Sequence, residues 1–384
     1  MNREVVVTGF AVRTGFGEGA EATRHGVFGG RSALAPVTRF DTAPFRASVA
    51  ATDGTPGPGS LRDALSKCAG DAVAAAGHPA GEDTAVLVGT AGDFTGVTGF
   101  WRRAEHTSGS TAGDTVAARQ ADLVAEHVGA RGPRLAFTNA CVASAVAIIH
   151  ACRLIATGRL DSAVCAGGYL VEEENFAKFD SGMAFSRDGV VRPFSAGRSG
   201  LLLGDGAAAI VLEAGDTARR RGARPLAAVI GWGMAADAHH VARPHPQARG
   251  LASAAGQALR RAGDPDGRWV DYVNAHGTAT KTNDPAETAG LRTVFGSRAD
   301  AVPVSSTKGA TGHLLEAAGA VEFVITMMAM LDGVLPPTAG YTAPDPDCDL
   351  DVVPNQPRRA DVWRALTVNA AFGGANTALL LERR

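Results

Sequence analysis

A cysteine stands where a short apolar segment gives way to a long one. The stretch "TNACVASAVAIIHAC", residues 138–152, places Cys141 after an expected strand and at the start of an expected helix. Unpaired backbone N–H groups and the helix dipole favour an anion at such a place, so the pKa of the thiol can fall and the thiol can act as a nucleophile. An isolated cysteine is more often a small buried apolar residue, so Cys141 needs support from other residues.

Two histidines of the second half of the chain give that support. His276 directly follows the expected strand "DYVNA", residues 271–275, and His313 starts a second apolar helix five residues after Lys308. The carboxyl ends of strands are where α/β proteins usually place their sites. Each histidine alone would more often be structural. Together they predict one cavity that contains Cys141, His276 and His313.

An internal repeat explains how these residues can meet. Residues 134–160 and 302–335 each give a short strand, a turn of small residues and a helix that is apolar on nearly every face. Such helices are normally buried. We therefore expect an α/β protein with two similar halves, 1–220 carrying the cysteine and 221–384 carrying the histidines, linked near residues 216–225. Two buried helices should lie between sheets, with further helices outside.

The ordered motifs resemble those of β-ketoacyl synthases, the condensing enzymes of the thiolase superfamily that act on acyl carrier protein. The matching segments span nearly the whole chain and include "RGPRLAFTNAC", "RPFSAGRSGLLLGDGAAAIVLE", "VNAHGTATKTNDPAE", "SSTKGATGHLLEAAGAVE" and "NAAFGGANTALLLE". The resemblance implies a thiolase-like, five-layered αβαβα sandwich. It also implies an acyltransferase that condenses an acyl chain with malonyl-carrier protein and needs neither a metal nor an organic cofactor.

The resemblance assigns chemistry to the three central residues. Cys141 would accept the acyl chain, and His276 and His313 would assist the malonyl thioester. Loss of CO2 leaves an enolate on the thioester oxygen, and imidazole donors aimed at that oxygen lower the barrier.

Five further residues take supporting roles by the same resemblance. Lys308 and Glu322 would support the site, and a glutamate in an apolar helix needs a buried polar partner on physical grounds as well. Phe372 would be a gate, with its backbone amide joining that of Cys141 in an oxyanion hole. Thr278 and Thr280 would contact the pantetheine arm.

Several positions depart from the family pattern. Val142 follows the nucleophile, Ala370 and Ala371 stand where a phenylalanine and a glycine are common, and the helix around residues 119–122 is polar. These changes favour a non-standard acyl substrate and a specialised bacterial polyketide or fatty-acid-like pathway. Polar residues that merely face solvent would explain the helix equally well.

Four other functions are less well supported by the sequence. A partner-dependent or chain-length-factor-like subunit would share the fold, but such subunits typically lack the cysteine. A non-decarboxylating acyltransferase could use the same nucleophile, whereas a thiolase should have a second reactive cysteine late in the chain, and Cys348 lies in an acidic segment. The spacing of Gly15, Gly17 and Ala20 matches a dinucleotide-binding fingerprint, but the strand ends too early and no suitably placed acidic residue follows.

The composition indicates which kinds of partner and which cellular compartment to expect. The chain has 384 residues and a formal net charge of -2, so no global field favours nucleic acid. The longest apolar run, residues 317–331, is too short to span a bilayer. Five cysteines without a CxxC pair suggest neither disulfides nor a metal site, and they favour the cytoplasm. The expected partners are acyl carrier protein and a second subunit, in a homodimer or a heterodimer with a chain-length-factor-like protein.

Overall fold

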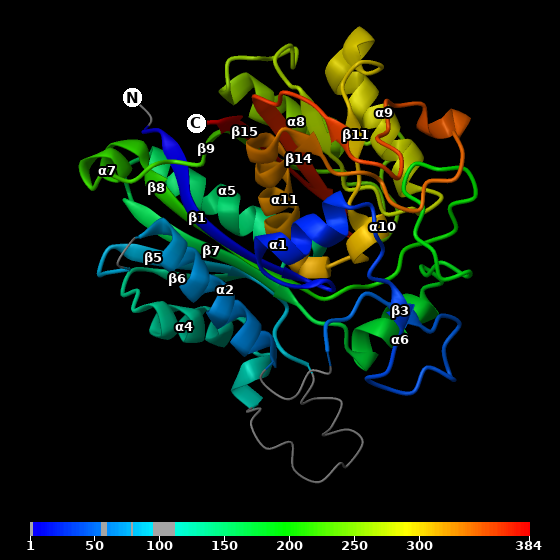
Figure 1. The fold of residues 1–384 in the computed structure, drawn as a ribbon, viewed down its shortest axis with the longest axis horizontal. Coiled ribbons are helices and arrows are strands. Elements are labelled where there is room, and N and C mark those ends of the chain that lie inside the picture. The colour runs from blue at the N-terminus through cyan, green and yellow to red at the C-terminus, as the bar shows by residue number, and fades with distance from the viewer. Residues whose placement is uncertain (1–2, 55–59, 78–79, 95–111) are drawn as a thin grey trace.

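A computed structural model describes residues 3–54, 60–77, 80–94 and 112–384. It shows two sets of strands that join into one large mixed sheet (Figure 1). Two helices lie between the two sets, and further helices cover the outer faces.

The first half of the chain forms one set of five strands. They are β1 (Val5–Thr14), β5 (Thr84–Gly89), β6 (Arg134–Phe137), β7 (Ser162–Tyr169) and β8 (Gly206–Ala214). Their order across the sheet is β1-β8-β7-β5-β6. Strand β5 runs parallel to β6 and β7, whereas β8 is antiparallel to β7 and β1.

The second half repeats this arrangement. Its strands are β9 (Ala227–Ala236), β10 (Tyr272–Asn274), β11 (Val304–Ser305), β14 (Arg364–Ala370) and β15 (Ala375–Arg383), in the order β9-β15-β14-β10-β11. Strand β10 runs parallel to β11 and β14, and β15 is antiparallel to β14 and β9. A short antiparallel contact between β1 and β9 joins the two sets. The two halves therefore have the same strand order and direction, while the division after residue 220 stays a prediction.

Two helices that are apolar on nearly every face lie between the two sets of strands. Helix α5 (Ala143–Ala156) packs on β5 and β7, helix α11 (Ala318–Asp332) packs on β14, and the two helices contact each other. A Cβ on Gly319 would come within 2.6 Å of the backbone nitrogen of Ala145, so this crossing requires a glycine. The Ala320 N–H donates to Ser144 Oγ at 2.9 Å. The expected layer of buried helices is confirmed.

The outer layers complete a five-layered αβαβα sandwich (Figure 1). Helices α2 (Ser60–Ala76) and α4 (Ala117–Val128) cover the first set of strands, and α8 (Arg249–Arg261) with α9 (Asn283–Phe295) covers the second. The shorter helices are α1 (Gly19–Thr23), α6 (Glu173–Ser181), α7 (Gly215–Arg220) and α10 (Lys308–Thr311). The short strands are β2 (Gly17–Glu18), β3 (Ala35–Pro36), β4 (Val49–Ala50), β12 (Val334–Leu335) and β13 (Arg358–Arg359).

Two details bear on function. Gly15 and Gly17 lie at the β1–β2 hairpin rather than at a direct turn from strand to helix, so the dinucleotide-binding interpretation lacks its structural context. Across the described residues, no helix combines the length and the apolar character that a bilayer crossing requires.

Candidate active site

One cavity of about 350 Å³ brings together six of the eight predicted site residues. They share exposure to this cavity and are Cys141, His276, Thr278, Thr280, His313 and Phe372. The remaining two, Lys308 and Glu322, are each 1% exposed and do not line it. Residues from both halves of the chain thus meet in one place, as the repeat predicted.

Cys141 lies in a 3-10 turn, Ala140–Val142, that leads directly into α5. The preceding residue, Ala140, has a φ of 49°, a left-handed conformation that is strained for a residue with a side chain. Burial raises the pKa of Cys141 to about 12, and the charge of Glu316 acts in the same direction. Burial thus acts against the lowering of the pKa that a helix start can give.

His313 lies between α10 and the 3-10 turn Leu315–Ala317, several residues before α11 begins at Ala318. The N–H of Leu315 donates to His313 Nδ1 at 3.2 Å. Since Nδ1 accepts, the neutral ring carries its hydrogen on Nε2. Burial, and then the charge of Lys308, holds the pKa of His313 well below its usual value. The ring is thus a neutral Nε2–H donor at the cavity wall.

His276 follows β10 at the carboxyl end of the strand. Its ring centroid lies 5.3 Å from that of His313, with the two ring planes 80° apart. Burial, and then the charges of Lys308 and His313, holds the pKa of His276 well below its usual value. Two neutral imidazoles therefore meet edge to face beside Cys141.

Two carboxylates at the start of α9 hold the loop that carries His276. The N–H groups of His276 and Gly277 each donate to Glu287 at 2.7 Å. Asp284 accepts from the N–H groups of Thr278 and Ala279, both at 3.1 Å. Sequence reasoning missed these two positioning residues. The signal for them was the pair of acids three apart in "NDPAE", at a helix start just after the histidine loop.

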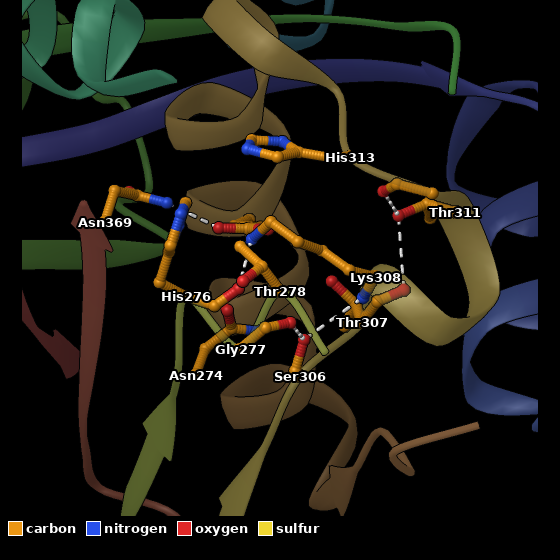
Figure 2. A network of polar contacts seen from close by, with 12 residues as sticks. Asn274, His276, Gly277, Thr278, Ser306, Thr307, Lys308, Thr311, His313 and Asn369 are labelled. Atoms are coloured by element: carbon orange, nitrogen blue, oxygen red, sulfur yellow. Dashed lines mark hydrogen bonds and ion pairs between the residues drawn. The ribbon is translucent and has the colours of Figure 1, made fainter. Parts of the chain in front are cut away.

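A buried polar network lies behind the two histidines (Figure 2). Lys308 Nζ donates to the carbonyl oxygen of His276 at 2.5 Å and pairs with Glu322 Oε1. Asn369 Nδ2 donates to Glu322 Oε2 at 2.5 Å. The buried partner that Glu322 was expected to need is confirmed, and Asn369 is a further member that the sequence did not indicate.

Phe372 lies in the turn between β14 and β15 at the mouth of the cavity. Its side chain is 52% exposed and stacks on Phe179 of α6, with ring centroids 5.9 Å apart. Ala370 and Ala371 also line the cavity. Thr278 and Thr280 line the same cavity, and their hydroxyls lie 3.0 Å apart. A long thin group entering past Phe372 would meet both hydroxyl groups and small apolar residues.

Comparison with known proteins settles the family. Residues 61–218 match the family model "Beta-ketoacyl synthase, N-terminal domain", and residues 226–342 match "Beta-ketoacyl synthase, C-terminal domain". The chain belongs to the β-ketoacyl synthase family. It is therefore a ketosynthase, an enzyme of the acyltransferase type.

Individual relatives agree over the full length. The chain is 33% identical to the 3-oxoacyl-[acyl-carrier-protein] synthase 2 of Coxiella burnetii, covering 99% of each chain. It is 36% identical to the tetracenomycin polyketide synthase ketoacyl synthase alpha subunit of Streptomyces glaucescens, covering 99% of this chain and 97% of that protein. Among solved structures, the ishigamide ketosynthase/chain length factor matches with a TM-score of 0.92 and 32% identity over all of both chains. The predicted thiolase-like fold is confirmed.

Proposed function

We propose that Cys141 accepts an acyl chain from acyl carrier protein and that His276 and His313 act on malonyl-carrier protein in a decarboxylative condensation. The observation that supports this assignment is the single cavity that one cysteine and two neutral histidines line.

The first step is acyl transfer. The sulfur of Cys141 attacks the carbonyl carbon of the acyl thioester, the bond from that carbon to the carrier's sulfur breaks, and the carrier leaves as a thiol with the proton of Cys141. Burial raises the pKa of Cys141, which favours the thiol form before the attack. The proton passes to the sulfur of the departing carrier, so this step needs neither histidine.

The second step is condensation. The malonyl thioester loses CO2, and the electron pair of the broken bond forms an enolate whose oxygen accepts from imidazole N–H groups. The enolate carbon attacks the acyl carbonyl, the bond to Cys141 breaks, and the sulfur takes up a proton. Neutral histidines suit this step, since a donor is required and His313 presents Nε2–H.

The remaining predicted residues take supporting roles in this proposal. Lys308 and Glu322 position the histidine loop rather than contact substrate. Phe372 gates the entrance, and its backbone amide joins that of Cys141 in the oxyanion hole. Thr278 and Thr280 contact the pantetheine arm of the carrier.

The pathway, the compartment, the cofactors and the second subunit are also proposals. We place the enzyme in a specialised bacterial polyketide or fatty-acid-like pathway, in the cytoplasm, with no metal or organic cofactor of its own. All five cysteines are free, which suits a reducing compartment. The second subunit is another copy or a chain-length-factor-like protein, and a match to a ketosynthase/chain length factor structure supports the latter.

The test is product formation from acyl- and malonyl-carrier proteins, read by mass spectrometry of the carrier-bound products. The wild type should give a 3-oxoacyl product two carbons longer, and Cys141→Ala should give none. A chain-length-factor-like subunit would give no product alone and would need a partner. A non-decarboxylating acyltransferase would transfer the acyl group without releasing CO2 from malonyl-carrier protein.

A further inference from the structure

A second polar group lies beside Cys141, outside the cavity with the histidines. The 3-10 turn Leu315–Ala317 packs against the turn Ala140–Val142. In both turns the first residue has an unusual left-handed backbone, with φ 49° at Ala140 and 41° at Leu315. Glu316 therefore occupies, in the second half, the place that Cys141 occupies in the first. It does not line the cavity that contains His276 and His313.

Two polar atoms in this region have no partner. The end of β7, where Tyr169 lies, packs against the turn that carries Glu316. Tyr169 is 4% exposed, and within the described residues neither its Oη nor Glu316 Oε2 has a hydrogen-bond partner. Nearly all buried polar atoms in native proteins are paired. These two atoms lie on neighbouring elements, one of them in the turn packed against that of Cys141, so one ligand group there can pair with both.

The charge of the region points to the chemistry of that group. Glu172, three residues after Tyr169, is partly buried, and the charges of Glu172 and Glu316 both act on Tyr169. Burial raises the pKa of Glu172 to about 9, and the charges of Asp93, Glu174 and Glu316 add to the rise. The charge of Lys178 lowers the pKa of Glu172. However, Lys178 Nζ pairs with Glu174 Oε1 at 2.7 Å, and the side chain of Lys178 is 60% exposed. Around Tyr169 the carboxyl groups outnumber the cations, since Arg39, whose charge also acts on Tyr169, pairs with Asp205.

We propose that Tyr169 and Glu316 bind the far end of the acyl group on Cys141, and that this end is a protonated amine. The inference rests on the proposed function, since it needs an acyl chain on Cys141. An ammonium group has three donors and a positive charge, so it can donate to both unpaired oxygens and favour the ionised form of the buried carboxyl groups. A purely aliphatic end would leave those polar atoms buried without partners, which is unfavourable.

Three acyl-carrier thioesters of equal length test the proposal. They carry 6-aminohexanoyl, 6-hydroxyhexanoyl and heptanoyl groups, and the rate of acylation of Cys141 is followed by intact protein mass. The 6-aminohexanoyl group should react about tenfold faster than heptanoyl, a difference that one charge-assisted contact supplies. The variants Glu316→Gln and Tyr169→Phe should each bring the ratio of the two rates close to one. Thermal melting checks that each variant is folded.

Glu126→Gln is the matched control, because Glu126 is an exposed carboxylate on α4 and should leave the ratio at its wild-type value. Heptanoyl reacting as fast as 6-aminohexanoyl would overturn the inference and leave the proposed function standing. A hydroxyl end that reacts as fast as the amine would overturn the role of charge. Failure of all three groups to acylate Cys141 would overturn the proposed function itself, and this inference with it.

Discussion

Lys308 Nζ donates to the carbonyl oxygen of His276 at 2.5 Å, from a side chain that is 1% exposed. The lysine also pairs with Glu322 of α11. It therefore ties the histidine loop to the buried helix and lies behind the cavity wall, and its charge helps to keep both imidazoles neutral. This relationship makes Lys308 a positioning residue.

Replacing Lys308 should destabilise the fold strongly. Lys308→Met leaves Glu322 charged and buried without its cation, so the free energy of unfolding in urea should fall by about 3–5 kcal/mol. The double variant Lys308→Met/Glu322→Leu should recover much of that loss. Lys67→Met breaks an exposed pair with Asp71 and should change stability little. Equal losses for Lys308→Met and Lys67→Met would contradict this view of the network.

Glu287 should act on condensation through the position of His276. Glu287→Gln replaces one of the two oxygens that accept backbone N–H groups with an NH2 group that cannot accept. Release of CO2 from malonyl-carrier protein should slow by about 10–100-fold as the ring shifts. Acylation of Cys141 should persist. A variant that loses both activities together would indicate a general loss of structure instead.

The stacked pair at the cavity mouth should control entry. Because Phe372 is half exposed, Phe372→Ala should change the free energy of unfolding by no more than about 0.5 kcal/mol. Condensation should slow by about tenfold, since the turn loses its contact with α6. Phe179→Ala removes the same stack from the other side and should match it in steady-state kinetics. If only Phe372→Ala slows the reaction, the stacking of Phe372 on Phe179 does not control entry to the cavity.

Stability should depend on pH through the buried histidines. The pKa of His276 is well below 6.5 in the folded protein, so below about pH 6.5 the unfolded chain takes up a proton that the folded one does not. The folded state therefore loses stability as the pH falls. Between pH 7.5 and 5.5 the wild type should lose about 1.4 kcal/mol more than His276→Gln in urea unfolding. If the difference in the free energy of unfolding between the two proteins does not change with pH, the ring of His276 is not held neutral in the folded state.

Much of this site follows from local pattern. A cysteine at the start of an apolar helix, a histidine at a strand end and a repeated strand, turn and helix motif were enough to predict that Cys141, His276 and His313 meet. The same patterns predicted the buried layer of α5 and α11, because a helix without a polar face must be covered.

Features that depend on long-range packing could not be predicted. Asn369 is 47 residues from Glu322, and no spacing rule connects them. The apolar pattern extends back to His313, but the left-handed Gly312 and Leu315 interrupt the backbone, so α11 begins later than expected. The pKa of Cys141 depends on how completely the fold removes water from the thiol, which the helix start alone does not reveal.

The central claim is a division of labour between Cys141 and the two histidines, and single-turnover mass spectrometry tests it directly. His276→Ala and His313→Ala should each form the acyl adduct on Cys141 when given acyl-carrier protein. With labelled malonyl-carrier protein they should then release almost no CO2 and almost no 3-oxoacyl product, whereas the wild type converts the adduct fully. Variants that cannot form the adduct, or that condense at the wild-type rate, would contradict the account.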